Sequence, residues 1–339
     1  MKNALRSVIC RSFSALFSFV LVFSFFACSD GGYHTARLYG MGTFCSFTLE
    51  GGADEDGDAT PALAPLLSEA ENALSHRLEN SVTAALNRGE WVTVSDRLRS
   101  ALALSEQVKA KTGGLFSVSL LPITSLWNFD DEAPVPPTDA ALATALAQTE
   151  NSALLFEGNA VCRVGGDVDL GAIGKGYACD VLADALRARG ETGLLAVGGS
   201  LAAVGEKQGA PWQIGVRDPF SPSQNDLIGT LSLTDACVST SGSYEKTFTY
   251  EGKEYHHILN PQTGLPMESD LVSVTVVAES GVLTDILSTA CFLVGSEGAL
   301  ALAAEYGAAV LLIRSDGTLI ANAAMASLFT PAGREVTVQ

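Results

Sequence analysis

The chain reads Asp169-Leu170-Gly171-Ala172-Ile173-Gly174-Lys175-Gly176-Tyr177-Ala178-Cys179-Asp180 at the point that decides its fold and its chemistry. This stretch joins a short apolar strand to a helix that we expect to run from residue 176 to residue 189. Its glycines let backbone amides approach a ligand closely, the helix start offers unpaired N–H groups, and Lys175 adds a cation. The loop is therefore a candidate phosphate site. It matches neither the Walker nor the dinucleotide G-x-G-x-x-G pattern, and its spacing alone slightly favours an ordinary strand-to-helix turn.

The apolar periodicity around this stretch predicts an α+β fold. We expect a mainly antiparallel sheet core with packed helices and a smaller helical subdomain near residues 61–150. An acidic, glycine-rich loop is expected at 51–60 and a proline-rich loop at 131–138. Helices are predicted at 63–74, 95–112, 138–147, 284–293 and 296–306. Strands are predicted as a pair within 33–49 and at 153–157, 161–164, 194–197, 212–216, 229–234, 236–239, 246–250 and 272–277, with a final buried strand at 308–314.

Composition limits the kinds of partner. The 339 residues are 47% hydrophobic, enough for a substantial core, and 38 acidic against 20 basic residues give a formal charge of −18. Such a charge repels nucleic-acid phosphates, so we expect no nucleic-acid partner. A small phosphate ligand remains compatible if a lysine or a metal compensates its charge locally.

The first residues predict export. Lys2, Arg6 and Arg11 precede the apolar run 12–27, and Ala27-Cys28 has the form of a lipoprotein cleavage site. We expect residues 1–27 to be a signal peptide and Cys28 to carry the lipid, which would anchor the protein on the outer face of the cytoplasmic membrane. Phe25 stands where leucine is usual, so a plain signal peptide or a short membrane anchor are alternatives. The run is shorter than the roughly 20 residues of a spanning helix.

The cysteines give no metal pattern. Seven are present, two of them in the leader, and none forms a CxxC pair or a zinc spacing. The other five have mostly apolar neighbours, so we interpret them as small buried hydrophobic residues. One disulfide among them stays open.

Two groups of residues could carry chemistry. Asp285 and Thr289 are four apart on a predicted helix and so face the same way, and their oxygens suit a hard cation such as Mg²⁺. Taken alone, the pair is better explained as a helix aspartate beside a threonine bonded to the backbone. His257 precedes the turn Asn260–Gly264 and titrates in the range of a general base, but a histidine that caps the turn is as good an interpretation.

Five further segments accompany the opening stretch: residues 196–200, 215–219, 239–245, 257–264 and 284–290. In this order and at this spacing, the set resembles the FAD:protein FMN transferase family, also called ApbE, from about Met41 to the C-terminus. The resemblance implies an ApbE-like fold, with residues 33–339 as the transferase domain.

The resemblance also implies roles for individual residues. Asp285, Thr289 and a backbone oxygen of Ala172 would hold Mg²⁺, and His257 would be catalytic. Contacts to FAD are implied at Met41, Phe116, Ser117, Asp169, Lys175, His257 and Leu259. The chain departs from the family pattern at Ser117, which replaces an aspartate, at Ser200, which replaces an aspartate or asparagine, and at Asn260, which often is aspartate.

The implied reaction is Mg²⁺-dependent transfer of the FMN moiety of FAD to a threonine hydroxyl of an acceptor flavoprotein, with release of AMP. FAD is then a substrate, and the partners are FAD, the acceptor and the membrane through the lipid. A pyrophosphatase that splits FAD into FMN and AMP is an alternative. A non-catalytic flavin-binding lipoprotein and a structural surface lipoprotein are two others, of which the first conflicts with the intact Asp285/Thr289 pair and the second leaves the motifs unexplained.

Overall fold

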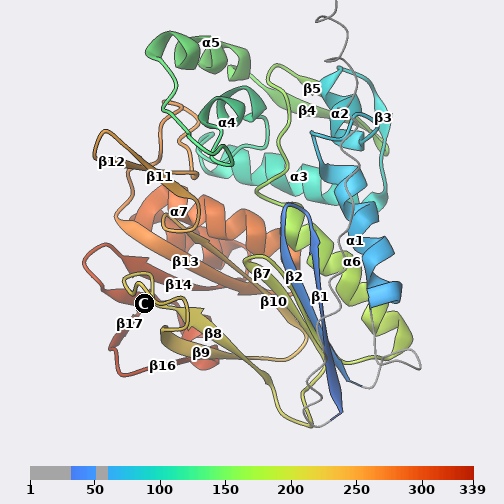
Figure 1. Cartoon of the computed structure of the whole chain (residues 1–339), viewed down its shortest axis with the longest axis vertical. Coiled ribbons are helices and arrows are strands. Elements are labelled where there is room, and N and C mark those ends of the chain that lie inside the picture. The colour runs from blue at the N-terminus through green and yellow to red at the C-terminus, as the bar shows by residue number, and fades with distance from the viewer. Residues whose placement is uncertain (1–31, 51–59) are drawn as a thin grey trace, which may run out of the picture.

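A computed structural model describes residues 32–50 and 60–339. Within these residues the main sheet has nine strands, which are antiparallel to their neighbours except for the last, parallel pair. In spatial order they are β1 (Tyr33–Gly40), β2 (Thr43–Glu50), β6 (Gly193–Val197), β7 (Ser200–Val204), β10 (Ala236–Gly242), β13 (Leu271–Ala278), β14 (Ala309–Arg314), β15 (Leu319–Ala321) and β17 (Val336–Val338) (Figure 1).

Both faces of the sheet are covered. The helices α1 (Thr60–Leu74), α6 (Gly174–Arg189) and α7 (Gly281–Glu305) pack on one face. The other face carries a second sheet of β16 (Phe329–Pro331), β9 (Leu227–Leu233) and β8 (Trp212–Arg217), together with α8 (Ala323–Leu328). Strand β14 shows the consequence, because Val310 and Leu312 enter the first core while Leu311 and Ile313 enter the second.

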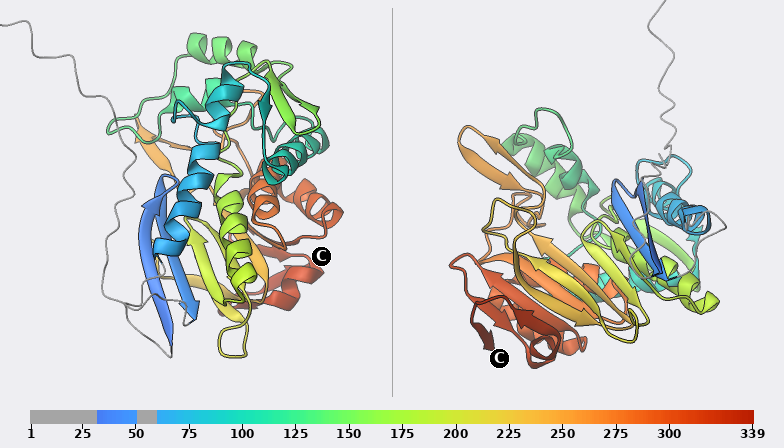
Figure 2. Two further views of the ribbon diagram at one scale, coloured as in Figure 1. Left: turned by 90° about the vertical axis from the view of Figure 1, so that its right-hand side faces the viewer. Right: turned by 60° about the horizontal axis from the view of Figure 1, so that its bottom comes forward.

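Most of the remaining helices gather at one end of the molecule, at the top of Figure 1. They are α2 (Val82–Asn87), α3 (Asp96–Lys111), α4 (Leu121–Trp127) and α5 (Asp139–Thr149), beside a small sheet of β3 (Val92–Thr93), β5 (Ala160–Val164) and β4 (Ala153–Glu157). The hairpin of β11 (Thr247–Tyr250) and β12 (Lys253–His256) reaches toward α4 (Figure 2). Its Phe248 and Tyr255 pack against Trp127 of α4.

The predicted α+β class and antiparallel sheet are confirmed. The helical portion is present, but α1 and α3 share the main core rather than forming their own. The two helices predicted at 284–293 and 296–306 are the two halves of α7, which Gly295 interrupts with a left-handed φ of 73°. The strand predicted as the last one, β14, is followed by β15, α8, β16 and β17, so that expectation was wrong. These short C-terminal elements are defined by their pairing with β14, β9 and each other rather than by a strong local pattern.

The predicted signal peptide with Cys28 lies outside the described residues, as do residues 51–59 of the loop predicted at 51–60. Thr60 is already the first residue of α1. Within them, α7 is the one helix long and apolar enough by composition to cross a membrane, and more than half of its most apolar window is buried in the fold. Its composition agrees with its place in the core between α6 and the sheet.

All five cysteines of the described residues are buried and free. The interpretation as small buried hydrophobic residues is confirmed. Burial raises the pKa of the Cys45, Cys237 and Cys291 thiols to about 12, so these side chains stay protonated and unreactive at neutral pH.

Candidate active site

The turn between β1 and β2 presents Met41 to the start of α6. Met41 and Gly42 have φ angles of 55° and 70°, and Gly40 pairs with Thr43, which makes a two-residue hairpin turn with both central residues left-handed. A Cβ added at Gly174 would lie 3.4 Å from the Met41 methyl carbon. A long side chain is uncommon at a positive φ. Here this conformation directs Met41 against residues 171–176, which we call the glycine–lysine loop.

Lys175 brings in a third segment. A Cβ at Gly198, in the turn between β6 and β7, would lie 3.2 Å from Lys175 Cδ and 3.0 Å from Thr43 Oγ1. The Gly198 N–H also donates to the Phe44 carbonyl at 3.2 Å. The φ of 58° at Gly198 favours glycine, and a Cβ there would press on the Lys175 stem. Segments near residues 41, 175 and 198 therefore meet at one end of the main sheet.

The start of α6 crosses the start of α7 backbone to backbone. A Cβ at Gly176 would lie 1.9 Å from the Gly281 carbonyl oxygen, and one at Gly281 would lie 2.4 Å from the Gly176 oxygen. This contact brings Asp285, which is only 5% exposed, to the glycine–lysine loop. Its Oδ2 accepts the Gly176 N–H at 2.7 Å, and its Oδ1 accepts the Ser200 hydroxyl.

Hydroxyl groups surround this carboxylate. Ser200 Oγ accepts the Ser239 hydroxyl at 3.0 Å, which lies 2.8 Å from Thr284 Oγ1. One turn further along α7, Thr289 Oγ1 lies 3.1 Å from Ser241 Oγ. The site is thus a buried aspartate among neutral oxygens.

This donor set fits Mg²⁺. No group of three or more His, Cys, Asp or Glu side chains suited to a metal occurs among residues 32–50 and 60–339, which argues against a closed zinc-type cage. Mg²⁺ is bound typically through one or two carboxylates, with waters and substrate phosphates as its other ligands. The Asp285 carboxylate has about four acceptor positions. The hydrogen bonds from Gly176 and Ser200 occupy two of them and leave room for a cation.

Asp169 and Ala172 lie in the loop before α6, and both are half-buried. Asp169 Oδ2 accepts the Thr124 hydroxyl at 2.7 Å and Oδ1 accepts the Gly171 N–H at 2.9 Å. His76 Nδ1 lies 3.8 Å from the same Oδ1. These contacts link the glycine–lysine loop to α4 and to the residues just after α1. Asp169 therefore helps to fix the conformation of this loop.

Burial and nearby positive charges, including Lys175 of the glycine–lysine loop, lower the pKa of His257. Burial is the largest cause that lowers its pKa from 6.5 to about 4, and the positive charges of Lys175 and Lys246 lower it further. Its Nδ1 is buried without a hydrogen-bond partner among the described residues. The ring is therefore neutral at pH 7 and keeps a nitrogen free, as a proton acceptor needs.

Its neighbour His256 is placed differently. His256 Nε2 lies 3.1 Å from the Met267 carbonyl oxygen, and the ring packs edge-on against Phe292 with centroids 5.9 Å apart. The His256 ring thus packs against the main core. The His257 ring instead lies beside Phe129, which packs with Trp127 of α4 and Phe248 of the hairpin.

The other residues predicted to contact FAD are more deeply buried. Phe116 is 1% exposed in the main core, and Leu259 is 5% exposed in a small cluster with Ile123 and Trp127. Ser117 is 9% exposed, and its Oγ accepts the Ser119 N–H at 3.1 Å. Contacts of Phe116 and Leu259 with FAD would therefore involve their backbone or a small shift of the side chain, and they stay predictions.

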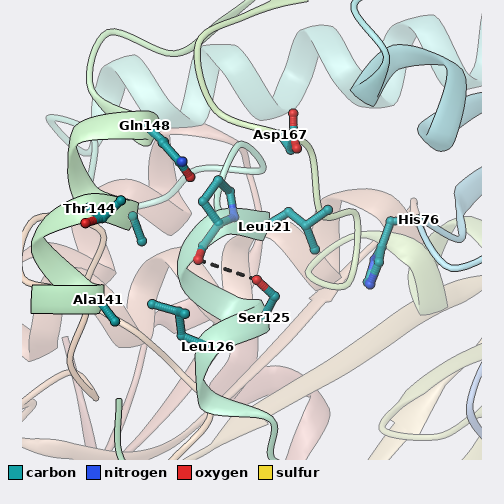
Figure 3. Close-up of a pocket in the computed structure, with 10 residues that line it drawn as sticks. His76, Leu121, Ser125, Leu126, Ala141, Thr144, Gln148 and Asp167 are labelled. Carbon is teal, nitrogen blue, oxygen red and sulfur yellow. Dashed lines mark hydrogen bonds between the residues drawn. The ribbon is translucent and has the colours of Figure 1, made fainter. Parts of the chain in front are cut away.

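A cavity of about 640 Å³ lies between α4, α5 and the segment around Asp167 (Figure 3). His76 stands at one side of it, and Leu121, Ser125, Leu126, Thr144 and Gln148 line the rest. Through His76 the cavity borders Asp169, but Lys175, His257 and Asp285 are not part of its lining. Sequence reasoning missed His76, whose only signals were that it is one of four histidines and follows an amphipathic helix. A second cavity of about 520 Å³ includes Ser117.

The α+β fold that carries these residues is the fold of the flavin transferase ApbE. The chain belongs to the ApbE family, whose sequence model matches residues 41–312. It is 34% identical over 328 residues to the FAD:protein FMN transferase of Treponema pallidum, covering 87% of this chain and 90% of that protein. It is 31% identical over 294 residues to one from Klebsiella pneumoniae, with coverage of 82% and 83%.

Solved structures give the same result. The ApbE protein of Thermotoga maritima matches with a TM-score of 0.76 and 29% identity, covering 89% of this chain and all of that one. The flavin transferase ApbE of Vibrio cholerae matches with a TM-score of 0.75 and 27% identity, covering 87% and 99%. The predicted resemblance is confirmed along nearly the whole described chain.

Proposed function

We propose that this protein is a FAD:protein FMN transferase that requires Mg²⁺ and joins FMN to a threonine hydroxyl of an acceptor protein. Its relatives carry the name FAD:protein FMN transferase. The observation that supports the proposal most is that one loop connects three residues that are far apart in the sequence. The charge of Lys175 in this loop lowers the pKa of His257, and Asp285 accepts the N–H of the next loop residue, Gly176.

The residues divide the work as follows. Lys175 and the amides of the glycine loop bind the pyrophosphate of FAD, and Met41 borders the flavin side. His257 accepts the proton of the threonine hydroxyl as its oxygen attacks the phosphorus on the riboflavin side. The bond between that phosphorus and the bridging oxygen breaks, and AMP leaves with the bridging oxygen. FMN then remains bound to the acceptor through a phosphoester.

Asp285, Thr289 and the Ala172 carbonyl would hold the metal ion. When bound, Mg²⁺ neutralises charge on the pyrophosphate oxygens. The Ser200 hydroxyl and the Gly176 N–H orient the Asp285 carboxylate for this role. The negative charge of bound FAD would offset the positive charge of Lys175, which lowers the pKa of His257. The pKa of His257 would therefore be higher in the complex, and the histidine would be a stronger base.

We also propose that the protein is exported and anchored by lipid at Cys28. The positive residues, the apolar run and Ala27-Cys28 support this location, and an acceptor on the outer side of the membrane would then be within reach.

The test is incubation of the protein with FAD, Mg²⁺ and a candidate acceptor that presents a threonine in an exposed loop. Flavin fluorescence that stays on the acceptor in a denaturing gel is the expected result. An acceptor in which valine replaces the target threonine should show no flavin fluorescence. Release of FMN and AMP with no labelling of any acceptor would instead identify a FAD pyrophosphatase. FAD binding without turnover would indicate a non-catalytic flavin-binding protein.

A further inference from the structure

The two helix starts that meet at the site are held by a reciprocal pair of aspartates. Asp285 of α7 accepts the Gly176 N–H of α6 at 2.7 Å. In the opposite direction, Asp180 of α6 accepts the N–H groups of Gly281 and Val282 at the start of α7, at 2.6 and 3.0 Å. The Ser280 hydroxyl donates to the same carboxylate at 2.9 Å.

We propose that Asp180 is a positioning residue for the metal site, acting through the start of α7. The proposal rests on the proposed function, because it assumes that Asp285 is a metal ligand. The carboxylate of Asp180 accepts three hydrogen bonds from consecutive residues 280–282 and so fixes both the direction and the register of the first turn that carries Asp285.

Geometry explains why this contact matters more here than an ordinary helix cap. The two backbones touch at Gly176 and Gly281, where no side chain can act as a spacer. A bond that holds the start of α7 against α6 therefore sets the separation of the two helix starts directly. Asp285 lies one turn along α7 from residue 281, so a shift of that turn moves its carboxylate relative to the glycine–lysine loop.

Charge adds to the effect. A carboxylate at a helix N-terminus interacts favourably with the helix dipole, by roughly 0.3–1 kcal/mol at exposed sites and up to about 2 kcal/mol where partly buried. Asp180 supplies its charge to α7 and Asp285 supplies its charge to α6, so each helix start is neutralised by the other helix. Removing Asp180 leaves N–H groups of α7 without an acceptor and frees its first turn to move.

Binding of Mn²⁺, a paramagnetic substitute for Mg²⁺, tests the proposal without any measurement of turnover. Full-length protein is titrated with Mn²⁺ in the presence of FAD, and free Mn²⁺ is followed by electron paramagnetic resonance. Asp180→Ala should weaken Mn²⁺ binding about tenfold or more, by analogy with other groups that orient metal ligands. Asp180→Asn keeps one acceptor oxygen and should lose less.

Two further variants make the result decisive. Asp184→Asn changes a carboxylate on the exposed side of the same helix, which pairs with Arg97 and Arg187, and should bind Mn²⁺ like wild type. Ser280→Ala removes one of the three donors that α7 residues 280–282 provide to Asp180. It should cause a smaller loss and is the variant to use if Asp180→Ala does not fold.

The outcomes separate this inference from the proposed function. If the wild type binds no Mn²⁺, or binds it as well after Asp285→Ala, the metal site itself is wrong. If the wild type binds Mn²⁺ and Asp285→Ala does not, but folded Asp180→Ala binds within twofold of wild type, Asp180 has no positioning role. If Asp180→Ala does not fold, binding within twofold of wild type by both Asp180→Asn and Ser280→Ala leads to the same conclusion. A lower melting temperature with unchanged Mn²⁺ affinity would likewise reduce Asp180 to a structural cap.

Discussion

At the residue scale, Asp285 is held by donors that carry no net charge. Ser200 donates a hydroxyl where the family pattern has an aspartate or asparagine, and Gly176 donates a backbone N–H. Position 200 therefore places a neutral hydroxyl, and not a second carboxylate, beside Asp285 in this chain. A single negative charge among neutral oxygens binds a divalent cation while leaving net positive charge for substrate phosphates.

Asp285→Ala should abolish FAD turnover while the protein stays folded, because the proposed metal site would lose its one charged ligand. Thr289→Val should cause a milder loss, since water can replace one neutral ligand. Turnover with and without excess chelator, together with the melting temperature of each variant, measures both effects. Full activity in chelator would rule out the metal requirement.

His257→Asn should reduce turnover far more than it weakens FAD binding, because general-base catalysis contributes roughly 10²–10⁴-fold. The loss should appear with threonine or water as acceptor. If His257 only supports the turn at 260–264, FAD affinity and melting temperature should fall together instead. The FAD dissociation constant, melting temperature and turnover from one preparation distinguish these cases, and unchanged turnover would remove His257 from the mechanism.

The lowered pKa of His257 also predicts a dependence of stability on pH. The folded protein resists protonation of this ring until about pH 4, whereas the unfolded chain takes up the proton near its ordinary pKa of about 6.5. Unfolding therefore takes up a proton between these values. The contribution is fully present above pH 6.5 and is lost as pH falls toward 4. Chemical denaturation across this range should show a smaller pH slope for His257→Asn than for wild type.

At the scale of secondary structure, the crossing of α6 and α7 is the contact on which the site depends most. It requires glycine on both helices, because each Cβ would collide with the carbonyl oxygen of the other backbone. The helices carry Lys175 and Asp285 in their first turns. The crossing distance therefore determines how far the proposed phosphate ligand, Lys175, lies from the proposed metal ligand, Asp285.

Gly176→Ala should lower the free energy of unfolding by about 3 kcal/mol or more, at the upper end for overpacked sites, and should reduce turnover. The added Cβ would have to push two backbones apart, and no flexible side chain can yield. Ala188→Ser, at an exposed position of the same helix, is the control and should unfold like wild type. Urea denaturation measures both, and a wild-type midpoint for Gly176→Ala would show that the two helices do not meet this closely.

At the scale of the whole molecule, the main sheet divides the fold into two cores, and the candidate site lies where the helix-covered side meets the helical end. The hairpin β11–β12 packs on helix α4 at this end of the molecule through Phe248, Tyr255 and Trp127. His257 follows β12 directly, so the same hairpin positions the proposed general base.

Export should be visible in the mass of the native protein. The leader pattern predicts a mature chain that starts at Cys28 and carries lipid, and replacement of Cys28 by serine should prevent the modification. Mass spectrometry of the membrane fraction is the measurement. An unmodified N-terminus elsewhere would indicate plain secretion, and an intact Met1 in the cytoplasm would contradict export.

The sequence alone was enough to predict the class of fold and the family, and it nominated the candidate site residues. Local patterns sufficed for α6, α7 and most strands, because amphipathic spacing and glycine punctuation act within a few residues. The order of motifs from Met41 to Thr289 identified the family, because its chemistry needs those residue types at those positions. Short elements such as β15 and β17 were missed, because their pairing with distant strands stabilises them more than their own propensity does.

The spatial arrangement of these residues could not be predicted from the sequence and came from the tertiary structure. It showed that Asp180 and Asp285 each cap the other's helix, that Ser200 bonds to Asp285, and that His76 stands beside Asp169. It also lowered the pKa of His257 through burial and through Lys175, which is 82 residues away in the chain (257 minus 175). Hydrogen bonds and charge effects depend on distances of a few ångströms, and those distances arise when separate segments pack.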